Sequence, residues 1–327
     1  MVKPGPVGQG AGAESGINSH VKIKCRVFAR NRMKCLKTKL GEFKMINDDS
    51  IVTYEPDNSL KKGYPQIFRE IIVEIVSNRW LTYQMFRRNF IAMYKQSFFG
   101  ILWVIILPII NIAVFAVLNN SGIFNIGDIH VPYPVYAICG LTFWQIFAVG
   151  LGSCVNALSS AEDMITRINF SRKSLVFAPM GRTMVSFIIQ MMLVGVLLLI
   201  YRTAPSIKFL FVPVVVLPIL FLTLGFGFIL AIMNAIVRDI ATILPLAITF
   251  LMYLTPVLYA KPSFGLLSRL TEYNPMYHFV AAGRDLILYG QINNVVGFLC
   301  SVAFSVVLFV ASVLIFHLTE TRITERV

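Results

Sequence analysis

Few side chains in this sequence could carry out acid–base or metal chemistry together. The four histidines, His20, His130, His278 and His317, are widely separated along the chain, and no group of carboxylates accompanies any of them. An enzyme needs acids, bases or metal ligands that converge on one site. The residue types therefore argue against catalysis, and we expect no catalytic residue and no metal site.

Two further chemistries are also disfavoured. The five cysteines, Cys25, Cys35, Cys139, Cys154 and Cys300, form no CxxC pair, so we interpret them as free thiols or small buried hydrophobic residues. The pattern GxxxxGK[ST], which holds ATP phosphates with backbone amides and a lysine, occurs nowhere in the sequence. The chain therefore lacks the sequence needed to hydrolyse ATP itself.

One short polar segment could contact a partner protein. Residues 159–173, SSAEDMITRINFSRK, lie between two apolar runs, and Ser160 with Asp163 matches a helix-capping box. A short capped helix here would carry acids in its first turn, where the helix dipole favours them. The alternatives are a docking element and an ordinary connecting loop, and this segment alone does not decide between them.

The elements that must position these residues are long apolar runs. The chain has 327 residues, of which 57% are hydrophobic and 14% charged, about half the charged share of a soluble domain. A membrane-spanning helix needs about 20 apolar residues. Six uncharged stretches have suitable lengths and predict an all-α membrane protein with six transmembrane helices: 98–118, 132–158, 183–201, 209–237, 241–260 and 286–316. The third could also begin near Ser174, with Arg182 at its membrane edge or in a protein-lined site.

The distribution of basic residues predicts the orientation of these spans. The net charge is +13, and residues 1–44 hold ten Lys and Arg against two Glu. Basic segments beside a membrane domain favour the cytoplasmic side and an anionic lipid surface over nucleic acid. We expect a multi-pass protein of the cytoplasmic (inner) membrane with both termini in the cytoplasm, and residues 1–50 as a basic, disordered extension.

A second amphipathic feature precedes the first span. From Pro65 to Lys95, apolar and charged residues alternate at helical spacing, and Ser77-Asn78 could divide the segment into two helices. The pattern is typical of a helix that lies in the membrane interface, and a soluble helical hairpin is the alternative. Farther along, residues 261–290 are too interrupted to span and predict one or two short re-entrant helices on the outer side.

Several runs of the sequence resemble a known family. The segment 54–111, with Tyr94-Lys95-Gln96-Ser97, Gly100, Trp103 and Pro108, resembles the start of ABC-2-type polysaccharide exporters, the permeases that export O-antigen, capsule or teichoic acid chains. Residues 133–148 (YPVYAICGLTFWQIFA), 237–259 (VRDIATILPLAITFLMYLTPVLY) and 273–290 (YNPMYHFVAAGRDLILYG) resemble later parts of the same family. The chain departs from the family at Arg88-Asn89, where an acid is common, and at Asn169-Phe170-Ser171, where a Phe-Pro pair is common.

The resemblance implies that transport and ATP hydrolysis are carried out by separate subunits. Two copies of the permease would form the path for a lipid-linked polysaccharide, and two separate nucleotide-binding subunits would bind ATP and Mg. Composition and the resemblance together divide the chain into four regions: a basic extension 1–50, which has no counterpart in the family, an interface region 51–97, a six-helix domain 98–318 that contains the coupling helix 159–173 and the re-entrant region 261–290, and a cytoplasmic tail 319–327.

Candidate site residues follow from the segments and from the resemblance. The charged residues of the coupling segment would contact the ATPase: Glu162, Asp163, Arg167, Arg172 and Lys173. The interface helix would contribute Arg87, Arg88, Tyr94 and Lys95, which could meet phospholipid or acidic substrate headgroups. Aromatic rings suit the passage of sugars, and the candidates are Phe115, Tyr136, Phe143, Trp144, Phe147, Phe250, Tyr253 and Tyr259. Arg238 and Asp239 form a charge pair at a turn, for which a structural role is favoured.

Other functions stay open at this point. An ABC-2 exporter of a drug or small lipid would share most of these motifs, and the long amphipathic segment favours the polysaccharide branch only through the resemblance. An integral-membrane enzyme that acts on envelope sugars, and a passive channel, are less favoured because the sequence lacks a catalytic cluster and contains a charged segment suited to a motor subunit.

Overall fold

The chain divides into two units, Met1–Glu55 and Pro56–Val327, and all the residues described below belong to the second. The computed structural model describes residues 64–95, 100–121, 131–161, 172–261 and 265–323. The regular structure in these ranges is helical. This agrees with the predicted all-α class.

The segment before the first span forms two helices, as its sequence predicts. Helix α1 (Tyr64–Ser77) ends at Ser77, and α2 (Arg79–Lys95) begins after Asn78. The Asn78 amide donates to the backbone oxygen of Glu74 at 2.9 Å, a local side-chain bond of the kind that competes with continued helix. Apolar side chains of α1 and α2, Ile71 and Met85, are buried against the rest of the unit.

Four described helices are long and apolar enough to cross a membrane. They are α4 (Tyr133–Val155), α6 (Lys173–Ile200), α7 (Val212–Ile236) extended by the short helix η3 (Ile207–Phe211), and α11 (Val295–Ile323). The apolar windows of α4 and α7 are 72% and 67% buried, whereas those of α6 and α11 are each 28% buried. The first two are therefore central, and the other two present apolar side chains outward.

Two shorter apolar helices correspond to the remaining predicted spans. These are α3 (Trp103–Asn120), whose described apolar stretch is Trp103–Val114, and α8 (Asp239–Leu254). The 16 residues of α8 rise about 24 Å, less than the roughly 30 Å of a hydrocarbon core. The structure thus supports a multi-pass membrane protein, and the count of six spans stays a prediction.

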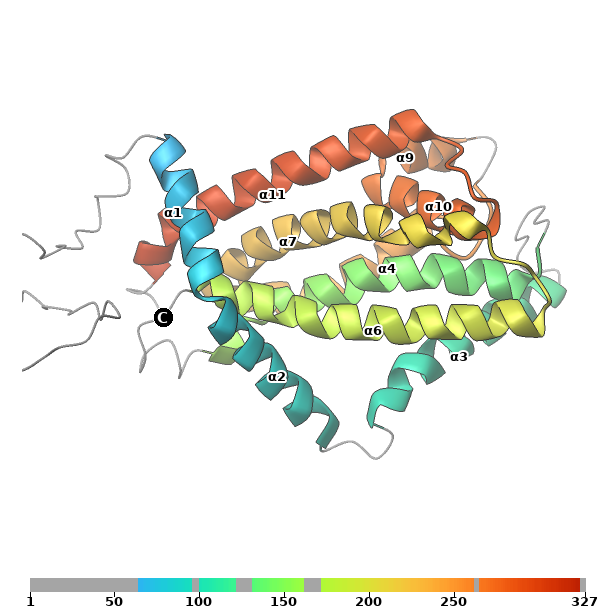
Figure 1. Cartoon of the computed structure of the whole chain (residues 1–327), viewed down its shortest axis with the longest axis horizontal. Helices are drawn as coiled ribbons and strands as arrows, with labels where there is room; N and C mark the ends of the chain where they lie inside the picture. Colours follow the sequence, from blue (N-terminus) through green and yellow to red (C-terminus); the bar gives the residue numbers. More distant parts are fainter. Residues whose placement is uncertain (1–63, 96–99, 122–130, 162–171, 262–264, 324–327) are drawn as a thin grey trace, which may run out of the picture. The chain divides into compact units, whose positions relative to one another are not determined.

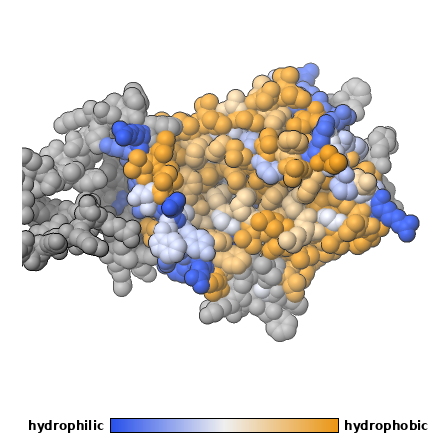
Figure 2. Space-filling model, in the orientation of Figure 1, coloured by the Kyte–Doolittle hydropathy of each residue, from blue (hydrophilic) through white to orange (hydrophobic). Residues whose placement is uncertain are grey.

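The long helices lie side by side with shorter helices at both ends (Figure 1). α7 packs against α4 and α11, and α4 also packs against α6. α2 contacts α6 near one end of the bundle, and α10 (Pro275–Leu288), preceded by α9 (Leu266–Tyr273), contacts α4, α7 and α11 near the other. Figure 2 shows an apolar surface over the bundle, with hydrophilic residues toward its two ends.

The region predicted as re-entrant contains two helices, α9 and α10. Both are short, and neither is among the candidate spans. Asn274 separates them. Its side-chain oxygen accepts from the backbone N–H of Met276 at 3.0 Å, and Pro275 occupies the first turn of α10. An asparagine cap followed by proline is a strong start signal for a helix, because proline lacks the N–H that would otherwise be unpaired there.

Candidate functional site

The predicted coupling segment is described only at its edges. Glu162, Asp163 and Arg167 lie outside the described residues, whereas Arg172 precedes α6 and Lys173 is its first residue. The Lys173 side chain is 1% exposed, and its ammonium donates to a carboxylate oxygen of Glu74 at 2.7 Å. As placed, Lys173 therefore connects α6 to α1 instead of facing outward.

The helix α2 lies against α6 at a glycine. A Cβ atom at Gly181 would come within 2.6 to 3.0 Å of ring carbons of Phe86, so the ring occupies the space that a side chain would need. The predicted membrane-contacting residues Arg87 and Arg88 are exposed on α2. Tyr94 and Lys95 belong to the last turn of α2, and their side chains lie outside the described part. The glycine contact and the Glu74–Lys173 ion pair together attach both interface helices to α6.

One amide side chain connects three helix ends beside the coupling segment. Asn234 of α7 is 1% exposed, and its nitrogen donates to the backbone oxygen of Val155 at 3.1 Å and to the hydroxyl of Ser159 at 2.9 Å. Its oxygen accepts from the backbone N–H of Ala241 at 3.0 Å. The end of α4, the start of the short helix η2 (Ser159–Ala161) and the first turn of α8 are thereby held by α7.

The predicted charge pair lies next to this amide. Arg238 and Asp239 are exposed, Arg238 directly precedes α8, and Asp239 is in its first turn. A carboxylate in the first turn of a helix is stabilised by the helix dipole. The structural role expected from the sequence stays a prediction.

The aromatic residues predicted for a substrate path fall into two groups. The α4 rings Phe143, Trp144 and Phe147 are 0%, 2% and 4% exposed, and they pack in the hydrophobic core of the chain itself. On α8, Phe250 and Tyr253 are 67% and 52% exposed. The side chain of Phe115 lies outside the described part. A path that contacts this chain would therefore meet the α8 rings at the surface and the three α4 rings only indirectly.

A cavity of about 230 Å³ opens beside α10, and we call it the Arg284 pocket. Its lining combines charged, amide and tyrosine side chains from the end of α4, the segment after α8, α10 and the connection to α11. The lining side chains used below are Tyr136, Lys261, Tyr277, His278, Arg284, Asp285, Tyr289, Asn293 and Asn294. Two of these residues, Tyr136 and Tyr289, come from helix ends, where aromatic side chains gather in membrane proteins.

Arg284 is the unusual member of this lining. It is 6% exposed, and its guanidinium carbon lies 3.9 Å from the centre of the Tyr136 ring, a cation–π contact. The Tyr136 hydroxyl donates to the backbone oxygen of Tyr259 at 3.2 Å, which fixes the ring. The guanidinium nitrogen Nη1 is buried and has no hydrogen-bond partner among the residues that the structure describes. Of the path candidates, Tyr136 thus lines this pocket, and Tyr259 contacts it only through the backbone oxygen that holds the Tyr136 hydroxyl.

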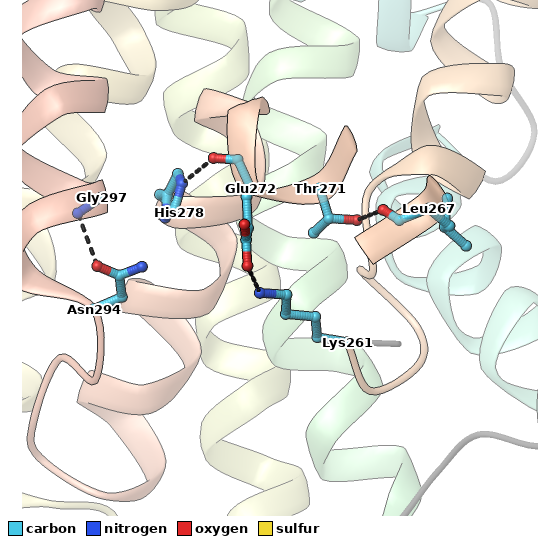
Figure 3. Close-up of polar contacts among 7 residues, drawn as sticks. All are labelled: Lys261, Leu267, Thr271, Glu272, His278, Asn294 and Gly297. Carbon is cyan, nitrogen blue, oxygen red and sulfur yellow. Dashed lines mark hydrogen bonds and ion pairs between the residues drawn. The ribbon is translucent and has the colours of Figure 1, made fainter. Parts of the chain in front are cut away.

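Hydrogen bonds keep the wall of the pocket in place (Figure 3). The Lys261 ammonium donates to Glu272 at 2.7 Å, and His278 Nε2 contacts the backbone oxygen of Glu272 at 2.8 Å. On the far side, the Asn294 side chain accepts from the backbone N–H of Gly297 at 2.8 Å and caps the start of α11. The hydrogen bond from Lys261 lowers the pKa of Glu272, so this carboxylate stays ionised.

Asp285 faces the same pocket from α10, which is not among the candidate spans. Its carboxylate accepts from the Asn293 side chain at 2.8 Å. Burial raises the pKa of Asp285, and this effect exceeds the opposing influences of Arg284 and the Asn293 hydrogen bond. Within the described ranges, no three His, Cys, Asp or Glu side chains gather in a way that could hold a metal ion.

The pocket and the Asn234 contacts were not apparent in the sequence. Arg284-Asp285 was visible as a charged pair at the edge of an apolar run, which is a general signal for a functional position. Glu74 and Asn234 had no such signal, because single polar residues are common at helix ends. Their partners lie 99 and 79 positions away in the sequence.

Comparison with known proteins shows the family of this chain. Three curated relatives are 26% identical, and each is named O-antigen export system permease protein RfbA. One, from Myxococcus xanthus, matches over 261 residues, which cover 79% of this chain and 99% of the relative. Two from Klebsiella pneumoniae match over 203 residues, which cover 61% of this chain and 77% of each relative. The family described as ABC-2 type transporter matches residues 81–288, more than half of the chain, so the chain belongs to the ABC-2 type transporter family.

Proposed function

We propose that this chain is the membrane-spanning permease subunit of an ATP-driven exporter that moves a lipid-linked polysaccharide across the cytoplasmic membrane. The observation that carries the proposal is the joint match to the ABC-2 family and to three O-antigen export permeases, one of them over 99% of its length. The apolar helices of the bundle are what a transport path through a membrane requires.

The proposal includes partners that the chain itself does not supply. Two nucleotide-binding subunits bind ATP and Mg on the cytoplasmic side, because this sequence lacks a phosphate-binding loop. A second copy of the chain completes the path. The exposed apolar surface of α8, with Leu246, Phe250 and Tyr253 at 74%, 67% and 52% exposure, is available to a second copy or to lipid.

Force from ATP binding would enter through residues 159–173, and the structure of the surrounding residues supports this assignment. The segment joins α4 to α6, and both edges are fixed: Ser159 by Asn234, and Lys173 by Glu74. We assign Glu162, Asp163 and Arg167 as contacts with the ATPase, and we assign Lys173 to bracing α1. Arg87 and Arg88 on the exposed side of α2 suit an anionic lipid surface.

The test is a reconstituted complex. The chain is co-expressed with a candidate nucleotide-binding subunit, purified in lipid nanodiscs, and assayed for ATP turnover with and without the chain. Charge reversal of Glu162, Asp163 and Arg167 together should uncouple turnover from the permease, whereas reversal of the exposed Arg269 on α9 should leave it unchanged. Turnover and export that survive the triple reversal would refute the coupling assignment.

The substrate class has its own test. Cells that produce a lipid-linked polysaccharide should accumulate it inside when the chain is removed, and export should return with the intact complex. A complex that exports small amphiphiles but leaves the polymer inside would overturn the polysaccharide assignment in favour of a drug or small-lipid exporter.

A further inference from the structure

The Arg284 pocket contains a buried cation whose donors are only partly used. Arginine stays protonated at all physiological pH values, so its charge cannot be removed by burial. A buried charge without a partner is unfavourable, and such groups normally meet an anion or a set of hydrogen-bond acceptors. Arg284 is 6% exposed, and its Nη1 finds no acceptor in the part of the chain that the structure covers.

The orientation of the Arg284 guanidinium shows which kind of ligand could accept its remaining hydrogen bonds. Tyr136 covers one planar face at 3.9 Å, and stacking of this kind leaves the N–H groups on the edge of the plane available. The edge of a guanidinium matches the two oxygens of a carboxylate or phosphate, because the parallel N–H donors can bind both. The missing partner therefore has the chemistry of an oxyanion.

The remaining lining fits the sugar ring that carries such an anion. The side chains of Asp285, Asn293 and Asn294 offer acceptors and donors for hydroxyl groups. Tyr277 and Tyr289 supply aromatic surface, and Tyr289 is 45% exposed at the pocket edge. We propose that the Arg284 pocket binds one acidic sugar unit, with the Arg284 guanidinium on its carboxylate or phosphate group.

The size of the cavity and its charge support a single acidic unit. A volume of 230 Å³ is below the roughly 300–1,000 Å³ of pockets for drug-sized ligands, so a long segment of polymer does not fit. Lys261 is paired with the Glu272 carboxylate at 2.7 Å, so Arg284 and Asp285 are the remaining charged groups of the lining. The buried Nη1 of Arg284 is the donor left for a ligand, and a charged oxygen satisfies such a donor better than a neutral sugar hydroxyl does.

This proposal extends the proposed function. It rests on that function only to explain why an acidic sugar would reach the pocket. A site at the end of the bundle opposite α1 and α2 would hold the polymer by one unit at a time. Binding at the pocket is a property of the chain alone and needs neither ATP nor the partner subunits. A binding assay and an export assay therefore fail independently.

The experiment measures binding of small probes to the full chain in lipid nanodiscs by isothermal titration calorimetry. Glucuronate, glucose and inorganic phosphate are titrated separately at the same ionic strength. We expect glucuronate to bind about tenfold or more tightly than glucose, because a hydrogen bond to a charged group contributes more than one to a neutral group. Glucuronate should also exceed inorganic phosphate, which lacks a ring for the tyrosines.

Two variants and a control separate the contributions. Arg284→Met should weaken glucuronate binding about tenfold or more, and it should still fold, because an apolar side chain replaces a buried and incompletely paired charge. Tyr289→Ala, at the exposed edge, should weaken glucuronate but leave phosphate unchanged. Arg269→Met, an exposed arginine on α9 outside the pocket lining, should change neither.

Four results would overturn the proposal. Equal affinity for glucose and glucuronate would remove the role of the oxyanion. Phosphate binding as tight as glucuronate, unaffected by Tyr289→Ala, would show a simple anion site that serves a phosphate from any source. Glucuronate binding that survives Arg284→Met in a folded chain, or no binding by the intact chain, would show that the pocket does not recognise acidic sugars.

Discussion

Loss of the Glu74 carboxylate should release α1 from α6. In Glu74→Gln, the Lys173 ammonium, at 1% exposure, loses the carboxylate that lies 2.7 Å away in the intact chain. Breaking a fully buried pair in this way costs about 3–5 kcal/mol. Glu74 is 29% exposed, so water reaches the pair and we expect about 3 kcal/mol, or roughly a hundredfold in the equilibrium between attached and detached α1.

The effect should be asymmetric between the two partners. Lys173→Met leaves the partly exposed carboxylate of Glu74 free to take up water, so we expect only about 1 kcal/mol. The double variant Glu74→Leu with Lys173→Met replaces both charges by apolar groups and should approach the intact chain. Arg69→Gln, which changes an exposed charge on the same helix, serves as the matched control.

Hydrogen–deuterium exchange in nanodiscs measures this directly. Amides of α1 should exchange roughly a hundredfold faster in Glu74→Gln, several-fold faster in Lys173→Met, and at the original rate in Arg69→Gln. Equal acceleration by the two single variants, or none in Glu74→Gln, would refute the reasoning. A Lys173→Met chain with normal α1 exchange but lost ATP coupling would instead return Lys173 to the surface that contacts the ATPase.

Three further predictions concern packing and pH. Gly181→Leu should separate α2 from α6 at a cost of about 1–3 kcal/mol, seen as faster exchange in α2, whereas Gly195→Leu, with open space around it, should have no effect. Phe143→Ala should lower the free energy of unfolding by about 3–5 kcal/mol, and Phe250→Ala on the exposed side of α8 by about 0.5 kcal/mol; equal losses in thermal unfolding would contradict their placement. Burial raises the pKa of Asp285, so the folded chain binds a proton more readily than the unfolded chain, and stability should fall as pH rises from about 4 through the raised pKa. In Asp285→Asn, this pH-dependent loss of stability should be absent. If the melting temperatures of the variant and the intact chain differed by the same amount at every pH, the assignment to Asp285 would be contradicted.

Much of the helical framework could be predicted from hydrophobic patterning. The break at Ser77-Asn78, the long helices α4, α6, α7 and α11, and the short helices in 261–290 all follow from composition over windows of 10 to 30 residues. The third predicted span agrees with the structure at its extended boundary. Its uncharged run begins at residue 183, the sequence also allows a start near Ser174, and α6 begins at Lys173.

Pairings between distant residues could not be predicted in the same way. Lys173 was expected at a surface that contacts the ATPase because charged residues in polar loops usually are exposed, but its carboxylate partner lies on α1. Phe143 and Trp144 matched the composition of a sugar path. In the structure, however, α10 approaches closely at Gly283 and encloses the Phe143 ring. Periodicity shows that a helix has faces, and only the packed structure shows what covers each one.

The amide of Asn234 makes the end of the bundle a pivot. Because one side chain holds the ends of α4, η2 and α8, a displacement that arrives beside Ser159 acts on these helices as one block. The 23 residues of α4 form an arm of about 34 Å. A tilt of about 5° at the pivot would carry the far end of that arm, and the Tyr136 ring with it, by about 3 Å. Unless α10, which packs against α4, follows this movement, the displacement would break the 3.9 Å stacking contact between Tyr136 and Arg284.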